Sequence, residues 1–404
     1  MMKKFPLHWQ IFLALVFGVL FGVFFPAQVK YISWMGDIFI RALKMIIIPL
    51  ILSSIISGVT NIGNAENLGR LGLKTILYYV MTSTLAIVTG LLFVNLLQPG
   101  VGADLGLSRN VEDLDIITDS FGQTLIKIIP TNIFQAFVEN RMLSVIFFAI
   151  LFGFFITRTN RKSKKVLTDF FDAVFDVMMK ITFFIIRFAP LGVFGIVALQ
   201  VSESGDILDL AQSMGKYMLA VMLALAVHAI ITLPLLTRFI GKAKPLKHFR
   251  NVTTPLLTAW STSSSSATLP LTIQAVEEND GVSNKISSFT LPLGATINMD
   301  GTALYECVAA MFIAQAYGID LTFGQQIIVV VTALLASVGA AGIPMAGLVM
   351  ISVILSAVGL PLEGVGLILS VDRILDMFRT ATNVWSDSCG AVIIAKSEGE
   401  ELKV

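Results

Sequence analysis

The 404-residue chain has few charged residues. Only 14% are Asp, Glu, Lys or Arg and 55% are hydrophobic, whereas a soluble domain has roughly 25% charged residues. Mean hydropathy is +0.84. This composition argues against a soluble domain and predicts a polytopic membrane protein. The net charge of +1 is divided among loops and forms no basic face, so we expect no nucleic-acid partner.

Cysteine is also scarce. Cys307 and Cys389 both lie in apolar helical sequence, where small buried side chains are expected rather than a disulfide or a metal pair. The sequence has no zinc or haem spacing, no nucleophile paired with a base and no cofactor motif, so we do not expect an enzyme. Lys3 and Lys4 precede an apolar run without a small-residue cleavage site, which we interpret as a retained first spanning helix.

Long apolar runs predict six spans in the first part of the chain, because about 20 apolar residues cross a bilayer. The runs cover residues 9–28, 31–62, 75–103, 142–157, 166–199 and 217–237. Basic and acidic loops alternate between them. The positive-inside rule therefore places the N-terminus in the cytoplasm and returns the chain there near Arg250.

Two later uncharged stretches lack the pattern of an ordinary span. Residues 251–276 hold a cluster of serines and threonines at their centre, and residues 321–362 are about twice as long as one span needs. Glycine and proline interrupt the second stretch at Gly339, Gly342, Pro344 and Gly347. Each stretch predicts a re-entrant hairpin of two half-length helices whose tip meets a polar cavity. Together with a broken helix over residues 294–302, they suggest an inverted-repeat secondary transporter.

The last apolar helix carries a polar stripe. At about 100° per residue, one helical face holds a set of six residues. The set is Asp372, Asp376, Arg379, Thr380, Asn383 and Asp387. Ionisable groups at membrane depth are costly unless they pair or meet water, so the stripe predicts a functional site. Two acids, a guanidinium and an amide favour a zwitterion or a cation as the bound species.

Four motifs carry a resemblance to a known family. The motifs SSSSATLP (263–270), NMDGT (298–302), GAAGIPMAG (339–347) and DxxRTxxNxxxD (376–387) resemble those of the dicarboxylate/amino acid:cation symporters. That family includes archaeal sodium-aspartate transporters, mammalian excitatory amino acid transporters and neutral amino acid exchangers. The resemblance covers essentially the whole chain. It implies an all-α homotrimer with eight transmembrane helices and two hairpins in each subunit, working as an elevator.

The resemblance also implies two domains. Residues 1–72 and 104–209 would form a trimerisation scaffold. Residues 73–103 and 210–404 would form a transport domain that moves across the membrane.

By resemblance, the substrate is an acidic amino acid such as glutamate or aspartate. Arg379 would clamp its side-chain carboxylate, a task that suits a planar guanidinium. Asp376 would hold the amino group and Asn383 the α-carboxylate. Further implied contacts are Ser264, Ser265, Thr302, Ile343, Gly347 and Thr380. From the residues alone, two alternatives stay open: an Arg379–Asp376 ion pair, and packing or helix capping by the serines.

The resemblance further implies three Na⁺ sites built from oxygen ligands, which a hard cation prefers. One would join the Asp387 carboxylate to carbonyls of Gly294, Asn298 and Asn383. A second would use backbone oxygens of Thr296, Met299, Ser337, Val338 and Ala340. A third would join Asp300 and Asn298 to Tyr79, Thr82 and Ser83. For residues 79–83, an ordinary polar helix contact is the alternative.

Glu306 lies beyond Asp300 in an apolar helix, where a carboxylic acid is expected to hold a proton readily. Archaeal sodium-aspartate members resemble this chain but carry glutamine there, whereas mammalian glutamate transporters carry the acid. We therefore hypothesise that Glu306 carries H⁺ with the substrate and that the protein returns with K⁺. The alternative is a neutral glutamic acid hydrogen-bonded to a backbone carbonyl.

One departure from the family concerns a second arginine. Archaeal members carry it where this chain has Ser263, and mammalian members where this chain has Met377. Arg373 lies four residues before Met377 on the same helix. His228 and Trp385 are expected to be structural, as a hydrogen-bonded histidine and a packed indole.

The leading prediction is therefore Na⁺-coupled uptake of glutamate or aspartate by a multi-pass protein of the cell membrane, in contact with lipid and with both termini cytoplasmic. A C4-dicarboxylate carrier is disfavoured because Asp376 would repel an anion without an amine. Neutral amino acid exchange is disfavoured because Arg379 would stay unpaired in a desolvated site. A substrate-gated anion channel or a substrate sensor stays open as a different class.

Overall fold

The computed structural model describes residues 7–63, 70–102, 126, 128–139, 141–203, 207–339 and 346–404. Over these ranges every regular element is a helix, which confirms the all-α prediction. Two of the predicted site residues, Ala340 and Ile343, lie outside the described residues.

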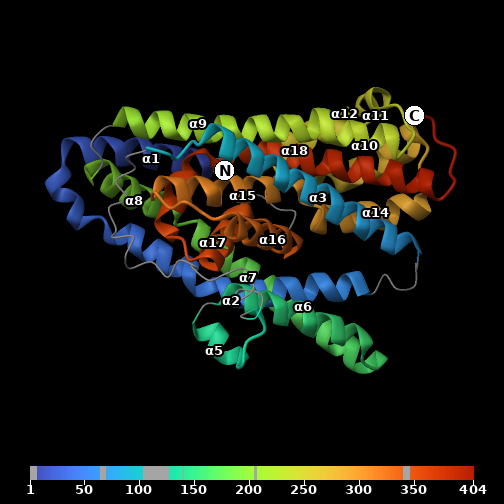
Figure 1. The fold of residues 1–404 in the computed structure, drawn as a ribbon, viewed down its shortest axis with the longest axis horizontal. Helices are drawn as coiled ribbons and strands as arrows, with labels where there is room; N and C mark the ends of the chain where they lie inside the picture. Colours follow the sequence, from blue (N-terminus) through green and yellow to red (C-terminus); the bar gives the residue numbers. More distant parts are fainter. Residues whose placement is uncertain are drawn as a thin grey trace, which may run out of the picture.

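Five long helices form one packed group. Helix α1 (Leu7–Phe24) lies along α8 (Ala189–Glu203), and α2 (Trp34–Gly63) packs against α6 (Met142–Arg158), α7 (Arg161–Ile186) and α8. The short helices η1 (Pro26–Tyr31) and α5 (Ile133–Val138) pack at the edges of this group. In Figure 1, α2, α6 and α7 lie along the lower side of the molecule.

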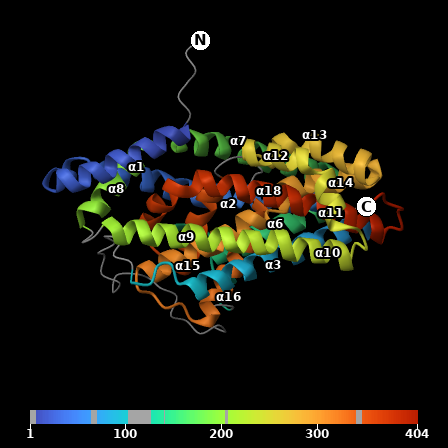
Figure 2. The ribbon, with the colours of Figure 1, turned by 90° about the horizontal axis from the view of Figure 1, so that it is seen from above.

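A second group forms around the C-terminal helix. Helix α3 (Arg70–Leu97) packs against α9 (Ile207–Val227) and α15 (Asp300–Ala316). The α9 helix continues through the π-helix η4 (His228–Thr232) into α10 (Leu233–Phe239), followed by α11 (Pro245–Asn251). Helix α18 (Val365–Ser397) contacts α9, α15, α12 (Thr253–Thr262) and α14 (Asn284–Ile297). It runs through the interior beside α9 in both views (Figures 1 and 2).

The first predicted hairpin is present as two short helices. Helices α12 (Thr253–Thr262) and α13 (Ser265–Ala275) pack against each other and against α18. The chain reverses at Ser263, which adopts the left-handed conformation with φ 52° and ψ 38°. The Ser264 hydroxyl then accepts a hydrogen bond from the Ala267 amide and so caps α13. The serine run is therefore both the turn and the helix cap. The π-helix η5 (Val276–Asp280) ends the hairpin.

The broken helix is also present. Helix α14 (Asn284–Ile297) stops at Asn298 and Met299, whose backbones are not helical, and α15 begins at Asp300. Beyond it, α16 (Phe323–Gly339) and α17 (Ala346–Val358) pack against each other, and η6 (Leu362–Gly364) leads into α18. The interruption in the middle of a buried helix exposes backbone groups at the centre of the fold.

Several span boundaries differ from the predictions. The predicted span over 166–199 is not one straight helix, because α7 and α8 meet at a bend of 52° where Pro190 starts the new helix. The first and third predicted spans end earlier, at Phe24 and Leu97. Among the described helices, three are long and apolar enough to cross a membrane, or four if the bent pair counts as one.

Candidate functional site

The polar face of α18 is buried at the centre of the fold, as the helical spacing predicted. Asp372, Arg379, Asn383 and Asp387 each expose 3% or less of their surface, and Asp376 exposes 6%. Such burial of charge requires partners from other elements or from a bound ion.

Arg379 is held by two carboxylates and one aromatic ring. Its Nη2 donates to Asp376 Oδ1 at 2.7 Å and lies 3.0 Å from Asp372 Oδ1. Its guanidinium carbon lies 3.8 Å from the ring centroid of Tyr305, whose hydroxyl donates to Asp372 at 2.7 Å. The ion pair with Asp376, considered above as an alternative, is therefore present, and Asp372 shares the same nitrogen.

The other donors of Arg379 have no acceptor. Its Nε and Nη1 atoms are buried and have no hydrogen-bond partner within the described part of the chain. A Cβ atom built on Gly347 of α17 would lie 2.8 Å from Nη1 and 3.4 Å from the Thr302 methyl carbon. Helix α17 therefore approaches the side of the guanidinium that lacks a partner among the described residues. Unmatched N–H groups of a buried cation make this place suited to an anion such as a carboxylate.

Asn383 joins α18 to the start of α15. Its Oδ1 accepts from the Gly301 amide at 2.7 Å, and its Nδ2 donates to Thr302 Oγ1 at 3.2 Å. A Cβ atom on Gly301 would lie only 2.6 Å from the Arg379 carbonyl oxygen. Glycine at 301 therefore permits the close crossing that brings Asn383, Thr302 and Arg379 together. Thr380, also predicted for the site, is 5% exposed on the same helix.

The hairpin serines lie against this centre less directly. Ser265 is buried in α13, a helix that packs on α18, and Ser264 caps that helix. Arg373 lies with Nη1 3.9 Å from Asp376 Oδ2 and is about one third exposed. It is the second basic residue beside this aspartate, and its position differs from Ser263 and Met377, where the resemblance led us to expect a second arginine.

Asp387 and Asn298 form a neighbouring polar centre. Asn298 Nδ2 donates to Asp387 Oδ1 at 2.9 Å, while its Oδ1 accepts from Thr82 at 3.2 Å. A Cβ atom on Gly294 would clash with Asp387 Oδ1 and would lie 2.7 Å from the Tyr79 hydroxyl. That hydroxyl donates to the Thr290 carbonyl at 2.6 Å, so Tyr79 lies beside the Asp387 group as well as on the helix of Thr82.

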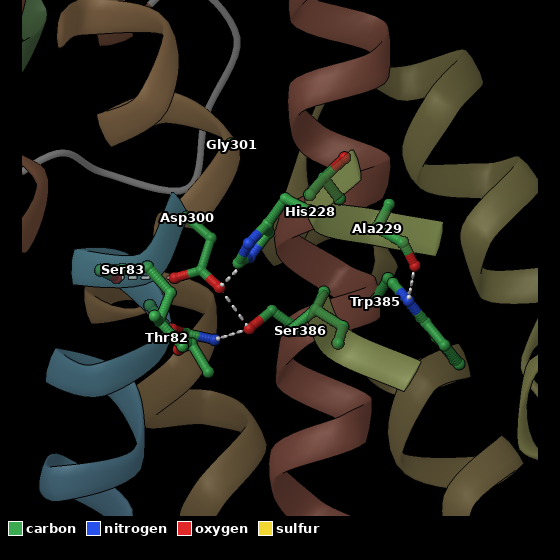
Figure 3. Close-up of polar contacts among 12 residues, drawn as sticks. Thr82, Ser83, His228, Ala229, Asp300, Gly301, Trp385 and Ser386 are labelled. Carbon is green, nitrogen blue, oxygen red and sulfur yellow. Dashed lines mark hydrogen bonds and ion pairs between the residues drawn. The ribbon is translucent and has the colours of Figure 1, made fainter. Parts of the chain in front are cut away.

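Asp300 lies in a third polar centre, shown in Figure 3. Its Oδ1 accepts from Ser83 at 2.6 Å, and its Oδ2 lies 2.7 Å from the Ser386 hydroxyl and 3.0 Å from His228 Nε2. Asp300, His228 and Ser386 are all fully buried. Neither Lys nor Arg makes an ion pair with Asp300 or Asp387 within the described ranges. Two buried carboxylates surrounded by hydroxyl, amide and carbonyl groups suit a hard monovalent cation.

Glu306 lies on the same helix as Asp300. It is fully buried, and neither carboxyl oxygen has a hydrogen-bond partner among the described residues. Within the described part of the chain, the hydrogen bond to a backbone carbonyl that we considered as an alternative is not formed.

The other predicted cation ligands lie on α14, on α16 and at the break between α14 and α15. Met299 is buried, and its sulfur lies 3.3 Å from Asn383 Nδ2. Ser337 is buried in α16 and donates to the Leu334 carbonyl, and Val338 follows it in the same helix. The Thr296 side chain is exposed and donates to the Leu293 carbonyl, so only its backbone can serve as a ligand. In the described ranges, no cluster of three or more His, Cys, Asp or Glu residues could hold a metal ion.

Sequence analysis did not assign His228, Tyr305 and Ser386 to the site, and it gave Asp372 no role beyond the stripe. Trp385, expected only to pack, stacks on His248 with centroids 4.9 Å apart and donates to the Ala229 carbonyl at 3.0 Å. The position of Asp372 on the polar face was a usable signal. Nothing in the sequence connects His228 or Tyr305 to α18.

Comparisons with known proteins identify the family of this chain. The sequence model of the sodium:dicarboxylate symporter family matches residues 7–397. The chain is 37% identical to the proton/sodium-glutamate symport protein of Geobacillus stearothermophilus, over 99% of this chain and 96% of that relative. It is 36% identical to the proton/glutamate-aspartate symporter of Escherichia coli, over 98% and 93%. It is also 36% identical to excitatory amino acid transporter 3 of Mus musculus, over 98% and 87%.

Proposed function

Since the chain belongs to the sodium:dicarboxylate symporter family, whose members are transporters rather than enzymes, we propose that it carries glutamate or aspartate across the cell membrane together with Na⁺. The observation that carries the proposal is the buried Arg379, whose Nε and Nη1 donors lack an acceptor among the described residues, with Nη1 facing Gly347. The names of its relatives, which are glutamate and glutamate-aspartate symporters, support the same substrate class.

In this proposal each end of the substrate has a partner of matching charge. The side-chain carboxylate binds the free donors of Arg379, the amino group binds Asp376, and the α-carboxylate accepts from Asn383 Nδ2. Thr302 and Thr380 supply hydroxyl groups, and Ser264, Ser265, Ile343 and Gly347 close over the ligand from the two hairpins. A neutral amino acid would leave Arg379 unmatched, and a dicarboxylate without an amine would meet the charge of Asp376.

Na⁺ completes the other two centres. Asp387 with Gly294, Asn298 and Asn383 forms one proposed site, and Asp300 with the α3 residues 79–83 forms another. Their support is the pair of buried carboxylates that meet neither Lys nor Arg within the described ranges. Binding of two cations there lowers the cost of burying those charges, which couples substrate closure to Na⁺. We propose one more Na⁺ site, built only from backbone oxygens. Its ligands are those of Thr296, Met299, Ser337, Val338 and Ala340.

Glu306 supports coupling to protons. An ionised carboxylate without any hydrogen bond is costly at this depth, so the protonated form suits the buried position. Two relatives are named proton/sodium-glutamate and proton/glutamate-aspartate symporters. We propose that Glu306 carries H⁺ inward with the substrate and that K⁺ accompanies the return step.

The two packed groups of helices support an elevator with a scaffold of residues 1–72 and 104–209 and a transport domain of residues 73–103 and 210–404. The proposed arrangement has eight spans, two re-entrant hairpins and both termini in the cytoplasm. Charged side chains on α2 and α7 support a homotrimer. Lys44, Asp176 and Lys180 are exposed in the single chain, although lipid is a poor environment for them. Contact with further copies of the scaffold would cover them.

Purified protein in liposomes tests the proposal. Uptake of radiolabelled glutamate, aspartate, serine and succinate is measured while external Na⁺ and internal K⁺ are varied one at a time. We expect saturable uptake of glutamate or aspartate that requires an inward Na⁺ gradient. Saturable succinate uptake without uptake of either acidic amino acid would refute the substrate assignment, and uptake independent of Na⁺ would refute the coupling.

A further inference from the structure

The two carboxylate oxygens of Asp300 have different surroundings (Figure 3). Oδ2 meets two donors, Ser386 Oγ at 2.7 Å and His228 Nε2 at 3.0 Å, whereas Oδ1 meets only Ser83 Oγ at 2.6 Å. A carboxylate oxygen accepts along two lone-pair directions, so Oδ2 is filled and Oδ1 has one direction left. A cation that binds Asp300 must therefore bind Oδ1, on the side of α3.

The hydrogen bonding defines the role of His228. A carboxylate only accepts, so Nε2 is the donor to Oδ2. Nδ1 is buried and has no hydrogen-bond partner among the described residues. The hydrogen bond to Asp300 is therefore the contact through which the His228 ring can orient the carboxylate.

The backbone around His228 is built to hold this position. In the π-turn the Leu233 amide donates to the carbonyl of His228, five residues earlier. By the same spacing, the Ala229 carbonyl would accept from the amide of residue 234. Residue 234 is proline, which has no amide hydrogen. The Trp385 Nε1 instead donates to that carbonyl at 3.0 Å. π-turns inside helices are frequent at functional sites.

Neighbouring residues on two helices therefore bind as a unit. Trp385 of α18 binds Ala229 of η4, while the next residue, Ser386, and the preceding residue of η4, His228, both bind Asp300. This arrangement connects η4 and α18 to one oxygen of a single carboxylate.

We propose that His228 is a positioning residue for Na⁺ binding at Asp300. Its Nε2–H, together with the Ser386 hydroxyl, holds Oδ2 so that Oδ1 faces Ser83 and the ion. The inference rests on the proposed Na⁺ role of Asp300. Outer partners that orient a metal ligand commonly change metal affinity by about 10- to 100-fold when they are removed.

The test separates hydrogen bonding from packing. His228→Gln keeps an N–H donor near the position of Nε2, whereas His228→Leu keeps bulk and removes the donor. Binding of radiolabelled glutamate or aspartate, whichever the wild type takes up, is measured on purified full-length protein as Na⁺ is raised at constant ionic strength. We expect the Na⁺ midpoint of His228→Leu to rise by about 10-fold or more. At saturating Na⁺ its substrate affinity should stay within about threefold, and His228→Gln should resemble wild type.

Specific outcomes overturn the inference. If His228→Leu has the Na⁺ midpoint of the wild type, the N–H donor is not needed. If the Na⁺ midpoint of His228→Gln rises as much as that of His228→Leu, the packing of the imidazole ring and not its N–H donor sets Na⁺ affinity. If His228→Leu does not yield folded protein, Ser386→Ala removes the other donor to the same oxygen. Its Na⁺ midpoint should then rise several-fold, and an unchanged midpoint overturns the inference. Wild-type protein that binds substrate independently of Na⁺ would instead refute the proposed function.

Discussion

Gly301→Ala is expected to weaken substrate binding because it separates α15 from α18. The added Cβ would lie 2.6 Å from the Arg379 carbonyl oxygen, where ordinary contact begins at 3.4 Å, so the two helices must move apart by about 0.8 Å. The neighbouring obstacle is backbone and cannot rotate away. The same movement would stretch the 2.7 Å hydrogen bond from the Gly301 amide to Asn383 to the limit of hydrogen-bond distance.

The expected magnitude follows from overpacking. Extra methyl groups in a packed core cost about 1–3 kcal/mol, which corresponds to roughly a 5- to 150-fold loss of affinity if the bound geometry bears the strain. Alanine also favours the helical state over glycine by about 1 kcal/mol, in the free and bound protein alike. The loss of thermal stability should therefore be smaller than the loss of substrate affinity.

The assay is equilibrium binding of labelled glutamate or aspartate at saturating Na⁺, together with thermal unfolding. Gly215→Ala in α9 is the matched control, because a Cβ there meets nothing within 4 Å, and it should bind like wild type. If Gly301→Ala binds substrate within twofold of wild type, the reasoning that this crossing positions Asn383 and Arg379 is wrong.

Three further predictions concern single side chains of the site. Arg379→Gln should lower the affinity for acidic amino acids by about a hundredfold or more, since hydrogen bonds to a charged donor contribute about 1.5–3 kcal/mol each. Equilibrium binding of labelled substrate measures this affinity, and an unchanged value would contradict the proposed role of the Arg379 Nε and Nη1 donors. Glu306→Gln should remove the dependence of uptake on external pH and on internal K⁺, measured in liposomes between about pH 6 and 8.5, and a wild-type profile would exclude Glu306 as the proton carrier. Asp300→Asn keeps the shape of the side chain and removes its charge, so the Na⁺ midpoint for substrate binding should rise by about tenfold or more. A midpoint equal to that of the wild type would exclude Asp300 as a Na⁺ ligand.

Much of the candidate site follows from helical periodicity. The stripe on α18 was predicted because residues three or four apart share one face, and its members are indeed buried together. The serine run and the polar residues 294–302 predicted interruptions of helices. The structure has these interruptions at Ser263 and at Asn298–Met299. Local sequence carries such information because caps and interruptions depend on neighbouring residues.

Other features could not be found this way. The continuous span predicted over 166–199 bends near Pro190, and the sequence pattern does not report how sharply two apolar helices meet. Tyr305 reaches Asp372 across 67 positions, and His228 reaches Asp300 across 72. Both residues lie in apolar helices where a structural role is the ordinary expectation.

By itself, the sequence determined an all-α membrane protein with a polar helix between two interrupted segments, and its motifs indicated the symporter family. Those properties depend on composition, on the 3.6-residue period and on local breaks. Only the tertiary structure decided which donors of Arg379 stay unpaired, that Gly301 sets the distance between α15 and α18, and that His228 and Ser386 occupy one oxygen of Asp300. These features arise where elements distant in the chain pack together, and their geometry depends on contacts that no local pattern records.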